Sequence, residues 1–524
     1  MGFVLERVWV IFASVKSIPN TIMKFNIIKS QNIFTILLSA CLFLGGLNIT
    51  KGNNVQIANA TRMGANNDII QFTLSWDNSW MVNGVPNNHD AVWVFIKFRE
   101  CGVTIDEWSH ALLSTNMGEH SFGPNVTYAT PILTTDRFGS GSGHNTGVMI
   151  RRNTIGTGNI TTQTIQLQIV GSSNGAIMDP TLEYDIKVFG IEMVNIPEGK
   201  FFAGDGASYY GLCQVGVSPL QPHLIESEAS LATIDYSSYN HTLSDSFPKG
   251  YASFYIMKYE ITHGQYVDFL NTITSPQQVN RSYLPTTYYY RYDVQYNGLE
   301  YYTNSIDRVL HYMSFHDVMA YLDWAALRPI TELEYEKACR GALNFVQGEW
   351  AWGSGATNDF KEIKKIDGAT PGIEIPLDSS NAHINVTQYT ITGGQFSLPG
   401  TYGNQGPVAA GIFARQTHQQ TRKGTGATYY GVMEMSGNVW EQCIQINTAY
   451  QSDNPSPYTG IWGDGQLTNG GFQNVINWPN AGFFILRGGS WREGLIRARV
   501  SDRGARGKSD YTGRFMDTGG RGAR

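Results

Sequence analysis

The chain has 524 residues, of which 42% are hydrophobic and 15% are charged. This composition excludes a disordered chain, and the length allows at least two globular domains. The formal net charge of -6 excludes nucleic acid as the main partner, because phosphate binding needs a concentrated basic surface. The 57 glycines, 28 tyrosines and 12 tryptophans are typical of a turn-rich protein with many strands.

The first 50 residues have the pattern of a targeting segment. Lys24 and Lys29 precede the apolar run Ile33–Leu44, which is too short for a comfortable membrane span. A basic region followed by such a run predicts a secretory signal, so we expect residues 1–50 to be a leader and the mature protein to be secreted or at the cell surface. Residues 38–41 are also similar to a bacterial lipoprotein box, in which Cys41 would carry a lipid anchor.

Residues 52–190 form the first predicted domain. Apolar and polar residues alternate over 70–76, 165–169 and 182–188, which predicts strands with one solvent-exposed face. The stretch 92–98 is apolar on both faces and predicts a central strand. Glycine-rich and Asn-Gly turns connect these runs, and several short strands with such turns predict a β-sandwich. No catalytic set of residues is evident here, which favours a packing or adhesion module.

Helix signals begin in the second part of the chain. Residues 254–262 predict a strand, and Thr262 is placed to cap a helix over His263–Asn271. A further helix is expected from Ser314. Thr331, followed three residues later by Glu334, predicts a capping box at the start of another helix.

These segments resemble, in order, the formylglycine-generating enzyme (sulfatase-modifying factor) family. The resemblance starts at Ile191–Phe201, includes Gly431–Glu441 and ends with the Gly-Gly-Ser-Trp turn of Leu486–Trp491. It implies the family's fold, a C-type-lectin-like domain with little regular secondary structure and several inserts. We therefore expect an α+β chain in which this domain, residues 191–524, follows the β-sandwich.

The resemblance also implies a structural calcium site. By this likeness the ligands are the side chains of Glu434 and Glu441 and the carbonyl oxygens of Gly437 and Val439. The two carboxylates lie seven residues apart around a Gly-Asn turn, and hard oxygen ligands on an irregular loop suit calcium. The alternative is a structural turn in which Glu441 pairs with an arginine.

The chain departs from the family where the chemistry takes place. In the family's copper-dependent oxidases, one cysteine follows the Ser of Gly-Gly-Ser by three positions and another comes five positions later. Here these positions are Glu493 and Ala498. A carboxylate and a methyl group cannot replace the soft sulfur that holds cuprous copper, so we expect neither copper nor a catalytic residue. Cys443, next to the calcium loop, has no partner thiol in the sequence pattern.

The C-terminal segment is locally basic. Arg487–Arg524 contains nine arginines and one lysine against four acids. The favoured interpretation is that these arginines act as planar forks that tie loops to carbonyl and carboxylate groups. The alternative is a site for an anionic ligand.

Two hypotheses for function follow. The first is an exported, non-catalytic surface protein that binds other surface proteins or copies of itself, with a structural or adhesive role in ligand binding or self-assembly. The second is an oxidase or related modifying enzyme of the family with a non-standard metal site. Copper binding and oxygen consumption distinguish the two.

Overall fold

The computed structural model describes residues 54–102, 107–128, 146–214, 221–234, 240–286, 290–355, 366–367, 375–376, 384, 386, 406–414, 421–446, 456–479, 482–505 and 512–524. The predicted leader and Cys41 lie outside these residues, so the signal and the lipid anchor stay predictions. The described residues belong to one compact unit. None of the described helices has the length and apolar character needed to cross a bilayer.

Strands dominate the described residues. They are β1 (Gln56–Met63), β2 (Ile69–Met81), β3 (Asp90–Glu100), β4 (Ser109–Leu113), β5 (Val126–Tyr128), β6 (Val148–Arg152), β7 (Gly156–Ser172), β8 (Tyr184–Ile196), β9 (Phe201–Ala203), β10 (Cys213–Gln214), β11 (His223–Ile225), β12 (Leu231–Ile234), β13 (Asn240–Leu243), β14 (Phe254–Met257), β15 (Gln295–Tyr296), β16 (Tyr301–Tyr302), β17 (Arg328–Pro329), β18 (Ile366–Asp367), β19 (Ile375–Pro376), β20 (Trp440–Ile444), β21 (Phe484–Arg487), β22 (Thr518–Gly519) and β23 (Gly522–Ala523).

The helices are short and fall in the second half of the chain, apart from one 3-10 turn. They are α3 (His263–Leu270), α4 (Ser275–Arg281), α5 (Phe315–Trp324), α6 (Glu332–Arg340) and α7 (Arg422–Thr425), with 3-10 turns η1 (Met117–Glu119), η3 (Ile412–Ala414) and η4 (Leu495–Ala498). The mixture of strands and short helices agrees with the predicted α+β class.

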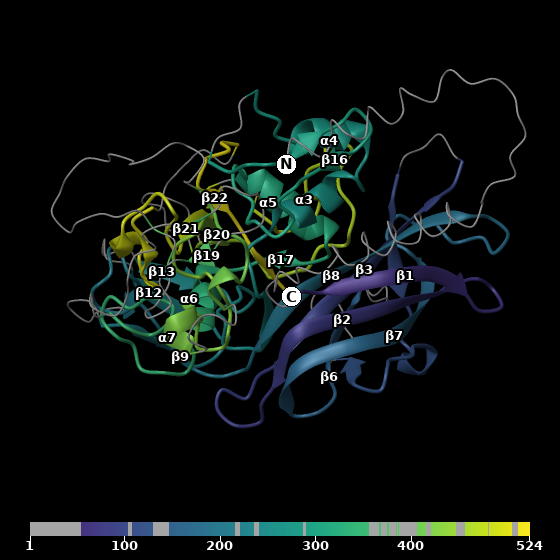
Figure 1. Cartoon of the computed structure of the whole chain (residues 1–524). Helices are drawn as coiled ribbons and strands as arrows, with labels where there is room; N and C mark the ends of the chain where they lie inside the picture. Colours follow the sequence, from purple (N-terminus) through teal and green to yellow (C-terminus); the bar gives the residue numbers. More distant parts are fainter. Residues whose placement is uncertain are drawn as a thin grey trace, which may run out of the picture. The chain divides into compact units, whose positions relative to one another are not determined.

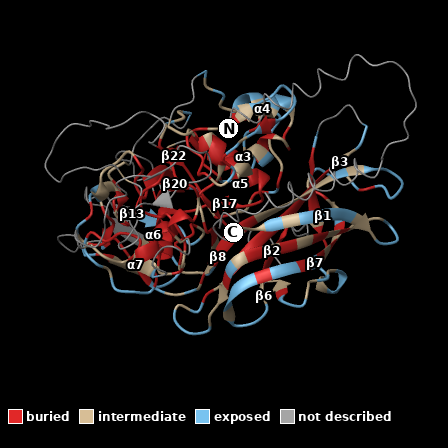
Figure 2. Ribbon diagram, viewed as in Figure 1, coloured by how far each residue is buried: buried red, intermediate tan, exposed pale blue. Residues whose placement is uncertain are grey.

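The strands predicted before residue 190 are present. In β2, Ile70, Phe72 and Leu74 are buried and alternate with half-buried residues, and β3 is buried on both faces over most of its length. The buried apolar side chains of β2 and β7 form one cluster with those of β3 and β6. Figure 2 shows that β1, the outermost strand, is largely exposed.

These strands form one continuous sheet. Its order is β1-β2-β7-β4-β3-β8-β14-β23-β17, with β6 paired to β3 and β5 paired to β6 (Figure 1). The two halves of the expected sandwich are connected because β4 pairs with β7 on one side and with β3 on the other. The predicted β-sandwich of two separate sheets is therefore not confirmed.

β8 connects the two predicted domains. Its residues 184–194 pair with residues 90–100 of β3, and its residues 193–196 pair with 254–257 of β14. The predicted boundary between residues 190 and 191 falls inside this strand. Both predicted domains thus share one sheet, and their division stays a prediction.

The predicted helix starts are confirmed. Thr262 caps α3 by accepting a hydrogen bond from the backbone N–H of Gln265, and Ser314 caps α5 in the same way. Thr331 and Glu334 form a capping box at the start of α6. The helices pack on a cluster of buried residues that also includes Trp93 and Phe95 of β3, so the core extends from the sheet into the second half of the chain.

Candidate functional site

The loop that leads into β20 is fixed by an arginine from the end of the chain. Glu441 is 1% exposed, and both of its carboxylate oxygens accept hydrogen bonds from Arg521. The distance from Nε to Oε2 is 2.7 Å and that from Nη2 to Oε1 is 2.9 Å. Arg521 also donates to the carbonyl oxygens of Met257, Lys258 and Met433. One guanidinium group thus ties the end of β14, the loop and β20 together.

Glu434 is the second carboxylate of this loop and is also buried. Its Oε1 accepts a hydrogen bond of 3.0 Å from the backbone N–H of Gly411. Its Oε2 is buried and has no hydrogen-bond partner among the described residues. Burial raises the pKa of Glu434 to about 8, although the nearby charge of Arg521 acts to lower it.

A third carboxylate, Glu260, holds the turn of the loop. Nδ2 of Asn438 donates to Oε2 of Glu260 at 2.6 Å, and the backbone N–H of Val439 donates to Oε1 at 3.2 Å. Burial raises the pKa of Glu260 well above its usual range, with Arg521 opposing the shift. Glu260 is not among the residues that the sequence pattern indicated. The available signal was a carboxylate placed directly before apolar Ile261 at the end of a predicted strand.

The predicted calcium ligands fit the ion only in part. Glu434 fits, because it has a buried oxygen with no partner. Glu441 does not fit, because Arg521 takes both of its oxygens and adds a positive charge to the loop. The described residues contain no group of three His, Cys, Asp or Glu side chains that could hold a metal ion. Calcium at Glu434, Gly437, Val439 and Glu441 stays a prediction, and the alternative pairing of Glu441 with an arginine is present.

Positions 493 and 498 lie just after the Gly-Gly-Ser-Trp turn. Ser490 anchors this turn by donating to Oδ2 of Asp517 at 3.0 Å, and the backbone N–H of Glu493 closes it on the carbonyl of Ser490. Ala498 ends η4 and is fully buried. A Cβ added at Gly489 would lie 2.9 Å from Cα of Ala498, so the two backbone segments are in close contact.

The side chain of Ala498 belongs to a small apolar cluster. The cluster consists of Trp350, Trp352, Ile384 and Ala498, all of which are buried. The carbonyl oxygen of Ala498 also accepts a hydrogen bond of 2.7 Å from Ser436. The position that carries a thiol in the oxidases is therefore part of a packed interior in this chain.

The buried thiols elsewhere are poor substitutes. Cys339 and Cys443 are fully buried and form no disulfide. Burial raises the pKa of both thiols, so neither is a thiolate at neutral pH. Cys443 lies on β20, away from the turn in sequence, and its Sγ faces the carbonyl of Glu441 at 3.8 Å.

The C-terminal arginines act as braces. Arg487 donates to Glu332 at 3.0 Å and to Glu336 at 2.5 Å, and Arg503 donates to Glu332 at 2.7 Å. Arg514 pairs with Asp317 in the same manner. The interpretation of these residues as planar forks is confirmed, and the buried guanidinium groups of Arg487, Arg503 and Arg521 are not available to an external anion.

The loop, the Gly-Gly-Ser-Trp turn and most of the C-terminal arginines lie within a segment that matches a known protein family. Residues 191–520 match the family model of the sulfatase-modifying factor enzyme 1-like domain. No curated protein matches the chain. Because the match covers more than half of the sequence, it shows the family. The chain belongs to the sulfatase-modifying factor enzyme 1-like family.

Proposed function

We propose that this protein is an exported, non-catalytic member of its family that binds other surface proteins or copies of itself. The observation that carries the proposal is the replacement of the two thiol positions by Glu493 and Ala498. Cuprous copper favours soft sulfur ligands, and the resemblance implies that the family's oxidases use this metal to oxidise a thiol substrate. A carboxylate and a methyl group supply no sulfur ligand for this metal.

The packing around these positions supports the proposal. Ala498 fills an apolar cluster with Trp350 and Trp352, and Gly489 lies against its backbone. A cysteine substitution at 498 alone would face these indole rings without a partner thiol. The nearby arginines pair with buried carboxylates and so hold the loops in place. A stable binding scaffold requires ordered loops of this kind.

The surface of the strand-rich part supports a role in protein contacts. Val85, Ile155 and Ile177 are 87%, 58% and 77% exposed, and β1 forms an exposed sheet edge. Apolar side chains and unpaired strand edges are features that contacts between proteins use. The leader pattern of residues 1–50 supports export, so the partners would be surface proteins or further copies of this chain.

The test is to measure copper and oxygen chemistry on the purified protein. We expect no cuprous ion to be retained against a chromophoric chelator and no oxygen uptake with a cysteine-containing peptide. The variant that carries both Glu493→Cys and Ala498→Cys restores the thiol pair and serves as a positive control for cuprous binding. Stoichiometric cuprous binding by the wild type, together with peptide-dependent oxygen uptake, would overturn the proposal.

A second measurement addresses the binding role. Sedimentation velocity over a wide concentration range should show reversible self-association, or pull-down from the surface of the producing cell should recover a specific partner. A protein that remains monomeric at every concentration and recovers no partner would contradict this part of the proposal.

A further inference from the structure

Three strands, β1, β2 and β7, lie side by side at one edge of the large sheet (Figure 1). Ile70, Phe72 and Leu74 of β2 are buried in the core, so residues 69, 71, 73 and 75 lie on the opposite side of the strand. Strand pairing places residues 56, 58, 61 and 63 of β1 on one side of them and residues 164, 166 and 168 of β7 on the other. We call these positions the neutral face, because none of them is charged.

The neutral face lacks the charges that a solvent-exposed sheet ordinarily has. Lys, Arg, Glu and Asp fill roughly a quarter to a third of the surface of a soluble domain, so roughly three charges are expected on a face of this size. All of its residues are half-buried or exposed. Arg62 of β1 is not part of it, because Arg62 pairs with inward-facing Ile70 and its guanidinium group donates to carbonyl oxygens. A partner that complements this face is therefore uncharged as well.

The neutral face offers hydrogen-bonding groups instead of charges. The hydroxyl groups of Thr61, Ser75 and Thr164 form no hydrogen bond with any described residue. Nε2 of Gln166 donates to Oε1 of Gln71 at 2.9 Å, which leaves Nε2 of Gln71 and Oε1 of Gln166 for a ligand. The side chains form rows that are about 4.8 Å apart across the strands and about 6.7 Å apart along them. A partner that presents hydroxyl groups at regular intervals matches this pattern.

Two other kinds of partner fit the neutral face poorly. Tight contacts between proteins depend on buried aromatic and arginine side chains, and the neutral face has neither. Its long apolar side chains are those of Met63 and Ile69, which pair with each other at one end. Nucleic acid needs a concentrated basic surface, which is also missing from this face. A neutral polymer rich in hydroxyl groups is the partner that this chemistry fits.

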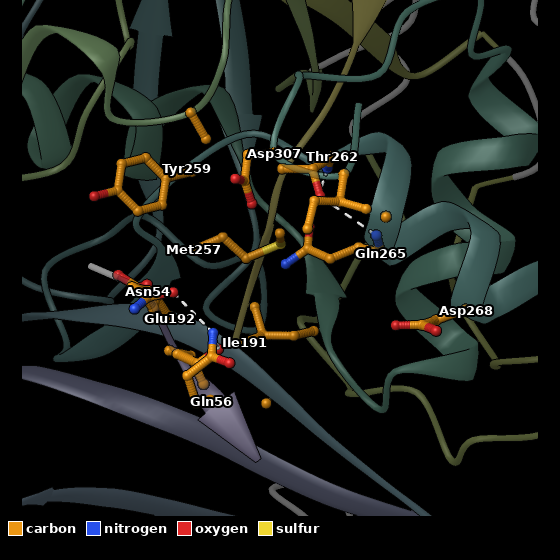
Figure 3. Close-up of a pocket in the computed structure, with 15 residues that line it drawn as sticks. Asn54, Gln56, Ile191, Glu192, Met257, Tyr259, Thr262, Gln265, Asp268 and Asp307 are labelled. Atoms are coloured by element: carbon orange, nitrogen blue, oxygen red, sulfur yellow. Dashed lines mark hydrogen bonds between the residues drawn. The ribbon is translucent and has the colours of Figure 1, made fainter. Parts of the chain in front are cut away.

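Carboxylates beside the neutral face act against an anionic polymer. Gln56 belongs to the face and also lines a pocket of about 270 Å³ (Figure 3). Asp268 and Asp307 line this pocket as well, and its lining contains no lysine, arginine or histidine. Their negative potential repels an acidic polysaccharide, whereas it has little effect on an uncharged one.

We infer that the neutral face binds an extended, uncharged polysaccharide of the β-1,4-linked kind found in cellulose and chitin. The hydroxyl groups of such a chain exchange hydrogen bonds with the Thr, Ser and Gln side chains of successive rows. Each contact is weak, but the chain repeats its groups along its length, so that several contacts together hold it. This site is separate from positions 493 and 498, and it adds to the proposed function a partner that is not a protein.

Co-sedimentation of the full chain with particles of cellulose and of chitin tests the inference. We expect at least one of these polymers to retain the protein in physiological salt. Starch and cellulose phosphate should retain much less protein, because starch is a helical glucan and cellulose phosphate is anionic. The comparison with starch tests the extended geometry of the ligand, and that with cellulose phosphate tests its lack of charge.

Removal of hydroxyl groups from the neutral face should weaken retention. The double variant that carries Thr61→Val and Thr164→Val keeps the shape and the strand propensity of both residues, and we expect its affinity for the retaining polymer to fall roughly tenfold. Thr154→Val is the matched control, because Thr154 is also exposed but lies in the turn before β7. Thr164→Lys places a charged side chain on the face and should weaken retention too. Circular dichroism checks that each variant is folded.

Retention of the wild type by neither cellulose nor chitin would overturn the inference, and so would equal retention of the double variant and Thr154→Val. Sedimentation velocity tests the alternative occupant. If the double variant loses self-association and keeps its retention, a second copy occupies the face and the inference is wrong. None of these results depends on copper binding or oxygen uptake, which decide the proposed non-catalytic function, so failure of one is distinguishable from failure of the other.

Discussion

Among single residues, Arg521 contributes most directly to stabilising the buried carboxylates of the loop that leads into β20. It pairs with Glu441 through two hydrogen bonds, and its charge also acts on Glu260 and Glu434. Arg521→Met removes the charge but keeps much of the volume, which leaves Glu441 buried without a partner. We expect the free energy of unfolding to fall by about 3–5 kcal/mol, measured by urea denaturation.

An exposed pair provides the comparison for that variant. Arg99 and Asp185 are 2.7 Å apart, but their side chains are 31% and 48% exposed. Solvent screens such a pair, so Arg99→Met should cost less than about 1 kcal/mol. Equal losses for the two variants would show that burial does not determine the strength of the Arg521 pair.

The partner of Glu441 could not be predicted from the sequence. The spacing of Glu434 and Glu441 was visible in the sequence, and so was a cluster of arginines at the C-terminus. Which arginine would reach Glu441 depends on the position of a segment 80 residues away. Local spacing carries no information about that approach. The fold places Arg521 on both oxygens of Glu441, and calcium at this loop stays a prediction.

At the scale of elements, the start of α6 depends on one hydroxyl group. Oγ1 of Thr331 accepts from the backbone N–H of Glu334 at 3.1 Å and donates to the carbonyl of Pro248 at 3.0 Å. Thr331→Ala leaves both groups unsatisfied in the interior. We expect a loss of about 1–2 kcal/mol in the free energy of unfolding. Thr331→Ser keeps the hydroxyl and should lose less than half as much in the same denaturation experiment; a loss equal to that of alanine would contradict the capping role.

Helix starts such as this one were predictable because a capping box is encoded within four residues. Strand alternation in β2 was predictable for the same local reason. The pairing of β4 with β7 was not, because it connects residues that are far apart in sequence, such as Ala111 and Ser172. Alternation states which face of a strand is buried but not which strand lies beside it, so the continuous sheet could not be predicted from the sequence, and the predicted β-sandwich is not confirmed.

At the scale of the whole molecule, the N-terminal strands and the family domain are joined by more than the shared strand. Nζ of Lys97 on β3 donates to the carbonyl of Gly465 at 2.6 Å, and Nε1 of Trp93 donates to the carbonyl of Ala325 at 2.8 Å. Nδ2 of Asn88 donates to the carbonyl of Tyr430 at 2.7 Å. These donors are buried, so separating the two parts would leave each acceptor without its partner.

This connection predicts that the described chain unfolds as one unit. Separate domains meet across small polar interfaces and melt independently, whereas here the pairing of β3 with β8 and the core around Trp93 belong to both parts. Calorimetry of the protein should show a single transition whose calorimetric and van't Hoff enthalpies agree. Lys97→Met removes the bond to Gly465 and should lower the midpoint of that transition without splitting it. Two resolved transitions, or a variant that melts the N-terminal strands first, would show that the two parts are independent domains joined by a strand.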